Sequence, residues 1–276
     1  MQPINVMVNG LPGSVATTVA RSVAADARFT LIPFSLTGPE IEARECKAAG
    51  ALVHLIPPGE RDEAVQELSA RYGRFLSVDY THPSAVNANA EFYCRSALPF
   101  VMGTTGGDRL MLEETVRRSE TVAVVAPNMA KQIVGFQAMM AYAADTFPGL
   151  FSGYTLEIRE SHQKGKADTS GTAKAMVGHF NRLGVSFSAE QIVRERDPQV
   201  QRSRWGIPEE HLAGHAWHTY RLLSADGTVR FEFTHNVNGR DIYALGTLDA
   251  LAFLEKKVAG GERGRVFSMI DVLKGS

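Results

Sequence analysis

The sequence has few cysteines, no long apolar run and no excess of either charge, and each of these absences narrows the class of protein. Cys46 and Cys94 are the only cysteines among 276 residues, and they are far apart and in no C-x-x-C pattern. This pattern excludes a disulfide framework and a thiolate metal site, and it favours a reducing compartment. We expect both thiols to be filler in the hydrophobic core.

Charge and hydropathy exclude two kinds of partner. Lysine and arginine total 29 against 30 acidic residues, so no bulk field would attract nucleic acid or an anionic membrane. No apolar run reaches the roughly twenty residues of a membrane span, and the N-terminus has no signal-peptide pattern. We therefore expect a cytoplasmic protein without a nucleic-acid or membrane partner. Its length favours two domains, and a hydrophobic content of 44% is enough for a large core.

The N-terminal segment has the order strand, glycine turn, helix. Residues 4–9 form a short apolar strand, Gly10 and Gly13 follow it, and a helical pattern begins at Thr17. Glycines at this place let the backbone approach a pyrophosphate, and a small residue at Ala16 permits close packing of the helix on a sheet. The spacing is G-x-x-G-x-x-A rather than G-x-G-x-x-G, and Pro12 has no N–H to offer a phosphate. A turn without any ligand is the alternative.

Strands and helices alternate along the rest of the first half. Strands are expected at 29–34, 74–79, 99–102 and 121–126, with helices at 62–71, 84–93 and 110–118. Crossovers of this length connect parallel strands, so the alternation predicts an α/β fold with a Rossmann-like, doubly wound sheet. Such sheets bind ligands beyond the carboxyl ends of their strands, where this chain has polar turns. The predicted cofactor-binding residues are Gly10, Gly13, Ser14, Val15, Ser35, Thr37, Tyr80, Thr81, Gly103, Thr104, Thr105, Pro127, Asn128 and Met129.

The end of the second expected strand bears on the choice of cofactor. NAD-selective sites usually have an acid here for the ribose hydroxyls, whereas NADP needs room, hydroxyl groups or a cation for its phosphate. The chain has Ser35 and Thr37, and its first acid is Glu40. We therefore predict NADPH as the preferred cofactor, with NADH possible and with both hydroxyls near the 2′-phosphate. The alternative is that the two hydroxyls only cap the turn.

The segment 160–173 combines an imidazole, two ammonium groups and a Ser-Gly-Thr turn ahead of a helical pattern. Residues 154–159 alternate apolar and polar side chains, as in a half-buried strand, so we expect His162 in the loop that follows. Free N–H groups of the helix and the hydroxyls of Ser170 and Thr172 suit a carboxylate. Lys164 and Lys166 add positive charge, and His162 can donate a proton or hold an oxyanion. The alternative is a capped helix with solvated lysines.

The patterns in the rest of the second half of the chain predict a second domain of α+β type with a mixed, largely antiparallel sheet. Strands at 215–223 and 229–235 are joined by Asp226-Gly227, and a turn at Asn238-Gly239 leads to a further strand at 240–244. One side of this sheet needs a helix and the other an oligomeric partner. Segments 247–257 and 266–273 are expected to return to the first domain.

A metal site built from His211, His215 and His218 is the other reading of this half. On a strand, residues 215 and 218 point to opposite faces, and no acid or cysteine is placed beside them. We therefore expect no metal.

Four motifs together resemble the dihydrodipicolinate reductase family: the Gly10 to Gly13 turn, Asp79-Tyr-Thr, Gly103-Thr-Thr-Gly and the segment from Glu160 to Ala173. The plant-type branch is the most similar. The resemblance spans nearly the whole chain and implies a dinucleotide-binding domain at 1–129 and 246–276, with a substrate-binding and oligomerisation domain at 130–245.

By this resemblance the reaction is the NAD(P)H-dependent reduction of 4-hydroxy-tetrahydrodipicolinate in lysine and diaminopimelate biosynthesis. His162 would be the acid, Lys166 would bind or protonate substrate, and Ser170, Gly171 and Thr172 would hold one carboxylate. Gln163 stands where many bacterial members have a second histidine. The partners implied are a small cyclic dicarboxylate and further copies of the chain, as a dimer or tetramer.

Two alternatives remain, because Ser14-Val15-Ala16 departs from the family pattern. One is a reductase of another cyclic imine or enamine dicarboxylate, and the other is a non-catalytic nucleotide or dicarboxylate sensor.

Overall fold

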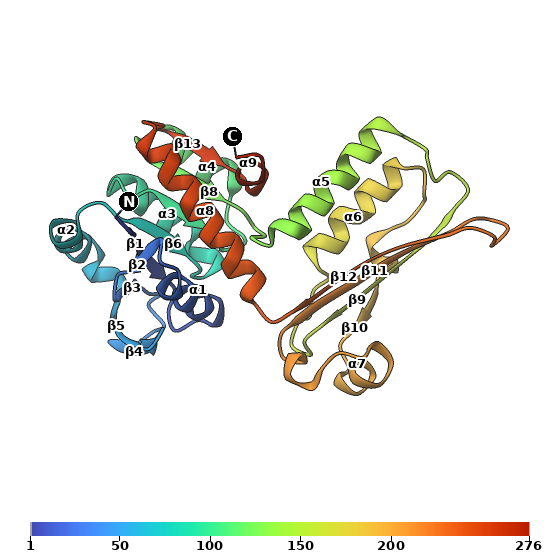
Figure 1. Ribbon diagram of the computed structural model, residues 1–276, viewed down its shortest axis with the longest axis horizontal. Helices are drawn as coiled ribbons and strands as arrows, with labels where there is room; N and C mark the ends of the chain where they lie inside the picture. The colour runs from blue at the N-terminus through green and yellow to red at the C-terminus, as the bar shows by residue number, and fades with distance from the viewer. Residues whose placement is uncertain (1, 276) are drawn as a thin grey trace. The chain divides into compact units, whose positions relative to one another are not determined.

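The computed structural model describes residues 2–275 as two units (Figure 1). One unit contains the chain up to Lys131 and again from Asp241 onward, and the other is Gln132–Arg240. The sequence placed these divisions after residue 129 and before residue 246.

The first unit contains a six-stranded parallel sheet in the order β13-β8-β7-β6-β1-β2. Met7 on β1 packs with apolar residues of α2, α3 and α4. Val6 and Val8 point to the opposite face and are fully buried, on the side where α1 and α8 pack together. Helices therefore cover both faces, which confirms the predicted doubly wound, Rossmann-like class. The elements are β1 (Ile4–Asn9), β2 (Phe29–Leu31), β6 (Leu76–Asp79), β7 (Phe100–Met102), β8 (Val122–Val125), β13 (Arg265–Phe267), α1 (Ser14–Ala25), α2 (Arg61–Tyr72), α3 (Val86–Arg95), α4 (Arg109–Arg117), α8 (Asp241–Ala259) and α9 (Met269–Lys274).

The strand expected at 29–34 is in fact two strands. Pro33 has no N–H for a ladder, so β2 ends at Leu31 and β3 (Phe34–Leu36) joins a different sheet. This small sheet has the order β3-β5-β4. Its strands β4 (Glu45–Ala48) and β5 (Ala51–Ile56) were not predicted from the sequence. The Leu36 carbonyl accepts a hydrogen bond from Gly10 N–H at 3.0 Å, so β3 ends beside the glycine turn.

The second unit contains a mixed sheet in the order β10-β9-β11-β12. Its strands are β9 (Thr155–His162), β10 (Val193–Glu195), β11 (His215–Leu223) and β12 (Arg230–Asn238). The β10 and β9 pair is parallel and the other two pairs are antiparallel, which confirms the predicted mixed sheet. His162 is the last residue of β9 and pairs with Ala216, so its predicted place in a loop is wrong.

The strand expected at 240–244 is also wrong, because α8 begins at Asp241. Gly239 has a positive φ of 75° and its N–H donates to the Gly214 carbonyl, which ends β12. An acidic residue then favours a helix start, since it complements the helix dipole. The fourth strand of the sheet is β10 instead.

Two helices pack side by side on one face of the mixed sheet, α5 (Lys131–Thr146) and α6 (Gly171–Arg182) (Figure 1). Met140 of α5 and Phe180 of α6 meet Ile158 and Tyr220 of the sheet in one apolar core. A shorter helix, α7 (Pro198–Trp205), follows β10. None of the described helices combines the length and apolar character needed to cross a membrane. Both cysteines are free and half-buried.

Candidate active site

The polar end of the mixed sheet lies where the apolar core ends. Ile158, Glu160 and His162 alternate along β9, so all three point to the face that α5 and α6 cover. His218 of β11 lies opposite Glu160, and His235 of β12 lies opposite His218. The same face of the sheet therefore changes from an apolar core to a group of one carboxylate and three imidazoles.

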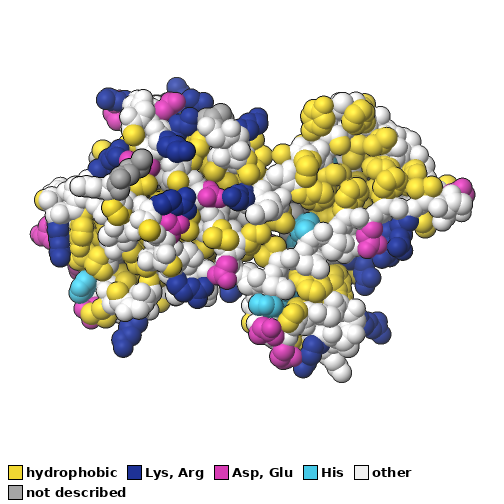
Figure 2. All heavy atoms as spheres, viewed as in Figure 1, with side chains coloured by type: hydrophobic (Ala, Val, Ile, Leu, Met, Phe, Trp, Pro, Cys, Tyr) yellow, Lys and Arg dark blue, Asp and Glu magenta, His cyan; other side chains and the backbone are white. Residues whose placement is uncertain are grey.

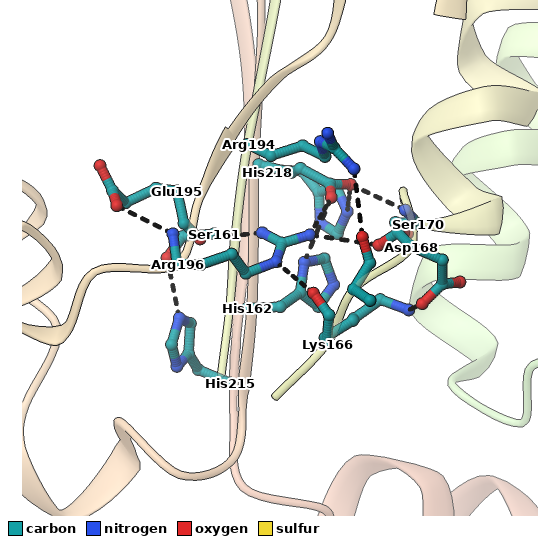
Figure 3. Close-up of polar contacts among 12 residues, drawn as sticks. Ser161, His162, Lys166, Asp168, Ser170, Arg194, Glu195, Arg196, His215 and His218 are labelled. Atoms are coloured by element: carbon teal, nitrogen blue, oxygen red, sulfur yellow. Dashed lines mark hydrogen bonds and ion pairs between the residues drawn. The ribbon is translucent and has the colours of Figure 1, made fainter. Parts of the chain in front are cut away.

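Glu160 connects three segments of this unit. Its carboxylate is fully buried and accepts hydrogen bonds from Arg196 Nη2 at 2.5 Å and from Ser170 N–H at 3.0 Å. Arg196 also donates from Nε to the Lys166 carbonyl at 2.8 Å (Figure 3). The pair therefore fixes the loop after β9 and the start of α6 onto the strand. Burying a carboxylate is tolerated here because it is paired and hydrogen-bonded.

Glu160 and Arg196 were not among the site residues predicted from the sequence. Glu160 could have been predicted from the alternation of the strand. Positions 156, 158 and 160 share one face of β9, and the first two are apolar. A charged side chain on a core-facing position needs a buried partner. No comparable local signal marks Arg196, which lies 36 residues further along the chain.

The loop after β9 presents Lys166 at its centre. Lys166 N–H donates to the Gln163 carbonyl at 3.0 Å, and the ammonium group lies 2.8 Å from Asp168 Oδ1. The ion pair lowers the pKa of the Asp168 carboxyl group. The Lys166 side chain is 23% exposed, whereas Lys164 lies in solvent. Lys166 is thus the partly sheltered cation of the two.

The predicted Ser-Gly-Thr turn forms the N-terminus of α6. Ser170 is the N-cap residue, and its hydroxyl makes no capping hydrogen bond. A Cβ added to Gly171 would meet nothing within 4 Å, so the space before the helix is open. The N–H groups of a first turn and the hydroxyls of Ser170 and Thr172 suit an anionic group. These roles remain predictions.

His162 is 6% exposed and uncharged at neutral pH. Burial lowers its pKa to about 3, and the positive charges of Arg196 and Lys166 act in the same direction. Burial also lowers the pKa of His218 well below its usual range and that of His235 to about 4. In the absence of a bound anion, Lys166 rather than His162 therefore carries the positive charge expected of this site.

Glu160, His162 and His218 form a group whose possible ligand atoms lie within 4.8 Å of one another. A carboxylate and two imidazoles are a common ligand set for zinc. However, both Glu160 oxygens already accept hydrogen bonds, one of them from a guanidinium group that would repel a cation. We assign no metal to this group. His215, weighed earlier as a ligand, points to the other face of the sheet and contacts Ser161 Oγ at 2.8 Å.

In the first unit, the glycine turn has no room for side chains. Gly10 has a φ of 97°, and a Cβ added there would lie 2.3 Å from the Tyr80 carbonyl oxygen. A Cβ at Gly13 would lie 2.8 Å from the Gly10 oxygen. Ser14 and Val15 open α1, whose first turn has neither an acidic residue nor a capping side chain. Its N–H groups are therefore available to a phosphate.

Asp79 organises the turns after β6 and β7. Its fully buried carboxylate accepts hydrogen bonds from the hydroxyls of Thr104 at 2.6 Å, Thr81 at 2.9 Å and Tyr93 at 2.7 Å. Asn89 donates to the same group. Two of the predicted cofactor residues are thus brought together by an aspartate that was noticed only as part of a motif. The polar turns after β6 and β7, which were predicted separately, are thus joined in one hydrogen-bond network through Asp79.

The remaining predicted cofactor residues differ in exposure. Thr105 and Pro127 are exposed, and Asn128 uses its side-chain oxygen to accept from Ala130 N–H at 2.9 Å. Met129 is buried, and its carbonyl lies where a Cβ of Gly246 would be, 1.7 Å from that position. This close approach fixes α8 against the turn after β8.

Ser35 and Thr37 are both almost fully buried. Ser35 Oγ accepts from Leu11 N–H at 3.2 Å, and Thr37 Oγ1 lies 3.3 Å from the Ile56 carbonyl. This arrangement matches the alternative in which both hydroxyls cap the turn. The contact of either hydroxyl with a 2′-phosphate stays a prediction.

The first unit has the fold of a nucleotide-dependent oxidoreductase. The second unit presents a partly sheltered lysine in the loop before an open helix N-terminus. Two family models match the chain, the N-terminus of dihydrodipicolinate reductase over residues 4–129 and its C-terminus over residues 133–273. The chain belongs to the dihydrodipicolinate reductase family, a family of NAD(P)H-dependent enzymes, and the predicted resemblance is confirmed.

Plant proteins are among the most similar relatives. A probable 4-hydroxy-tetrahydrodipicolinate reductase 1 of Oryza sativa is 47% identical, and the match covers 98% of this chain and 78% of that protein. The 4-hydroxy-tetrahydrodipicolinate reductase 2 of Arabidopsis thaliana is 46% identical, with coverage of 98% and 77%. A solved dipicolinate-bound dihydrodipicolinate reductase from Paenisporosarcina sp. TG-14 has the same fold, with a TM-score of 0.67, 17% identity and coverage of 96% and 97%.

The expected cytoplasmic location is contradicted by these relatives. Four plant proteins that are 45–47% identical are chloroplastic by name. Cysteine usage distinguishes reducing from oxidising compartments, but it does not distinguish one reducing compartment from another. The inference from composition was therefore too specific.

Proposed function

We propose that this protein catalyses the NAD(P)H-dependent reduction of 4-hydroxy-tetrahydrodipicolinate to tetrahydrodipicolinate in lysine and diaminopimelate biosynthesis. In this reaction a hydride from the cofactor and one proton enter the substrate, and its 4-hydroxyl group leaves as water. The observation that carries the proposal is the grouping of His162 at the end of β9, Lys166 in the loop that follows, and the N-terminus of α6. Relatives with this reductase name at 45–47% identity support it.

The binding roles follow from charge and hydrogen-bonding capacity. The Lys166 ammonium group pairs with one carboxylate of the substrate, and Gln163 donates a hydrogen bond beside it. The other carboxylate binds the hydroxyls of Ser170 and Thr172 and the N–H of Gly171 at the start of α6. A dicarboxylate is favoured because the site offers two separate places for an anion.

Whether His162 can act as the proton donor depends on the charge of the bound substrate. His162 is uncharged in the free protein because it is buried and lies near Arg196 and Lys166. A substrate with two negative charges would balance these two cations, so the ring can accept a proton and act as the acid. Lys166, in the loop after β9, is the other candidate acid.

We assign NADPH as the preferred cofactor and NADH as a usable one. The absence of an acid between β3 and Glu40 supports this preference. Ser35 and Thr37 support the turn from inside the protein, since both hydroxyls are buried. Gly10, Gly13, Ser14 and the network around Asp79 form the dinucleotide site of the first unit.

The second unit is the substrate-binding and oligomerisation domain of a homo-oligomer, either a dimer or a tetramer. Large apolar side chains are exposed on and just after α5, and Figure 2 shows apolar atoms gathered on this unit. Exposed apolar groups of this kind favour a protein partner. The exposed residues are Met139, Tyr142, Phe147 and Leu150. Light scattering after gel filtration gives the number of copies.

The test is oxidation of NADPH and of NADH by purified protein with freshly synthase-generated 4-hydroxy-tetrahydrodipicolinate. Rapid oxidation that needs substrate and is lost in Lys166→Ala, but not in Lys164→Ala, is the expected result. Lys164→Ala is the matched control because it removes an exposed ammonium group from the same loop. Nucleotide binding without turnover would indicate a sensor, and turnover only of another cyclic imine dicarboxylate would indicate a different reductase.

A further inference from the structure

The two carboxylate oxygens of Glu160 each face a histidine nitrogen. Oε1 lies 3.7 Å from His162 Nδ1, and Oε2 lies 3.7 Å from His218 Nε2. Among the described residues, neither nitrogen has a hydrogen-bond partner, and both are buried. His218 is 2% exposed and its other ring nitrogen is also unpaired. Figure 3 shows the rings of His162 and His218 beside Arg196.

The strand register produces this arrangement. Glu160 and His162 are two residues apart on β9 and therefore point to the same face, and His218 pairs with Glu160 across the strands. The His162 ring packs edge-to-face on His218, with centroids 5.1 Å apart and an angle of 79°. His235 stacks on the other side of His218 at 4.7 Å. Each ring is held in place by its neighbours, so the three groups form a fixed row.

An apolar side chain would suit position 218 better if its role were only packing. Tyr220 and Leu222, the next residues of β11 on this face, are in the apolar core. Buried ring nitrogens without partners are unfavourable for folding. The identity of the residue at 218 therefore needs a chemical reason. A carboxylate 3.7 Å away supplies one.

We propose that Glu160 and His218 are positioning residues for His162. In the substrate complex, Glu160 accepts a hydrogen bond from His162 Nδ1–H, so that Nε2 is the ring atom that faces the substrate. His218 holds the carboxylate from its other side. A carboxylate in this position fixes the orientation of an imidazole and stabilises its protonated form. The separation of 3.7 Å in the free protein is compatible with a bond that shortens on binding.

This inference rests on the proposed function, because it requires His162 to serve a bound dicarboxylate. The proton that His162 gives up at Nε2 is replaced from solvent, and the other ring proton stays bonded to Nδ1 and hydrogen-bonded to Glu160 throughout. The titratable and charged groups around His162 come from β9, the loop that follows it, the segment just after β10, and the strands β11 and β12. They are Glu160, Lys166, Asp168, Arg196, His215, His218, Tyr220 and His235.

The test uses two variants and one matched control. Glu160→Gln removes the charge but keeps the shape, and His218→Phe keeps a stacked ring without nitrogens. Glu157→Gln makes the same change on the same strand, at a side chain on the opposite face that pairs with Arg221. Steady-state kinetics from pH 6 to 9 with saturating NADPH give kcat and KM. Nitrogen-15 NMR of the histidines with dipicolinate, an aromatic dicarboxylate, gives the protonation of His162.

We expect Glu160→Gln to lower kcat at least tenfold, with KM changed less than about threefold, and to shift the pH profile. In the wild-type complex both nitrogens of His162 are protonated at pH 7, and in Glu160→Gln they are not. His218→Phe shows the same change with a smaller loss of kcat, about threefold to tenfold, and Glu157→Gln shows neither.

An unchanged pH profile and histidine spectrum in Glu160→Gln would overturn the inference. If Glu160→Gln fails to fold, His218→Phe decides in the same way. Inactive wild-type protein would instead count against the proposed function, since the inference predicts only differences from an active enzyme.

Discussion

Tyr80 packs so closely on Gly103 that a Cβ at position 103 would lie 2.3 Å from the Tyr80 ring. The phenol oxygen of Tyr80 is in turn 2.6 Å from Thr247 Oγ1 on α8. The turn after β7 is thus held by a ring from the turn after β6, whose hydroxyl is anchored on a third element. Glycine at 103 is required by this contact and not by its backbone conformation.

Gly103→Ala should therefore disturb the proposed nucleotide site. The ring of Tyr80 must move, which should cost about 1–3 kcal/mol of unfolding free energy and weaken NADPH binding at least tenfold. Gly59→Ala is the matched control, since a Cβ there meets nothing within 4 Å. Urea denaturation and quenching of cofactor fluorescence measure the two effects. Equal cofactor affinity in both variants would place the nucleotide away from this turn.

Arg196→Met should destabilise the second unit. It leaves the fully buried Glu160 carboxylate without its charged partner, a change that typically costs about 3–5 kcal/mol. Arg194→Met is the control, because Arg194 makes one hydrogen bond, to the Ala167 carbonyl, and is exposed. The midpoints of urea unfolding should differ clearly. If both variants unfold like the wild type, the buried pair contributes nothing to stability.

Stability should fall in mild acid because of the buried imidazoles. The folded protein holds the pKa of His162 at about 3, below the value of 6.5 for a free side chain, so the unfolded chain binds more protons below pH 6.5. The unfolding free energy then decreases as pH falls from 6.5 towards 4, by roughly 1.4 kcal/mol per unit for each such histidine.

His218→Phe should reduce this slope, since burial also lowers the pKa of His218. His54→Gln, at an exposed position of the first unit, serves as the control. The measurement is urea unfolding at several values between pH 5 and pH 7. A slope equal to the wild type in His218→Phe would mean that this ring is not an uncharged group in the folded protein.

Glu40→Gln should raise the preference for NADPH. Glu40 is the first acid after β3, and its carboxylate oxygens lie 2.3 Å from where a Cβ of Gly38 would be. A negative charge at this place would oppose a 2′-phosphate and favour the free ribose hydroxyls. We expect the ratio of kcat/KM for NADPH over NADH to rise about threefold to tenfold. Glu42→Gln, two residues further on and exposed, should leave the ratio unchanged.

Local patterns predicted most of the fold because they are set by short-range periodicity. The alternation of apolar and polar residues at 154–159 predicts which side chains of β9 point to the core. The alternation of strands and helices up to residue 126 predicts the parallel sheet. Predictions failed where one residue changed the outcome. Pro33 divided one expected strand into two, and Gly239 followed by Asp241 turned an expected strand into a helix.

The part of the site that could be predicted from the sequence is the part formed by one short segment. Motif residues such as His162, Lys166 and Ser170 are close in sequence and could be read together. Arg196 reaches Glu160 from the segment just after β10, and Asp79 accepts hydrogen bonds from the turns after β6 and β7 and from α3. Such partners depend on which strands are neighbours, so sequence periodicity alone does not reveal them.

Ile158, Glu160 and His162 share one face of β9, so the packing of Ile158 in the hydrophobic core fixes where the two polar side chains lie. A shift of one residue against β11 would turn Ile158 away from the helices and bring Arg159 and Ser161 inward. The loss of apolar packing would make the shifted register less stable, whether or not substrate is bound. Selection for a well-packed sheet is therefore also selection for the placement of Glu160 and His162, and variation in the core can alter activity without touching the site.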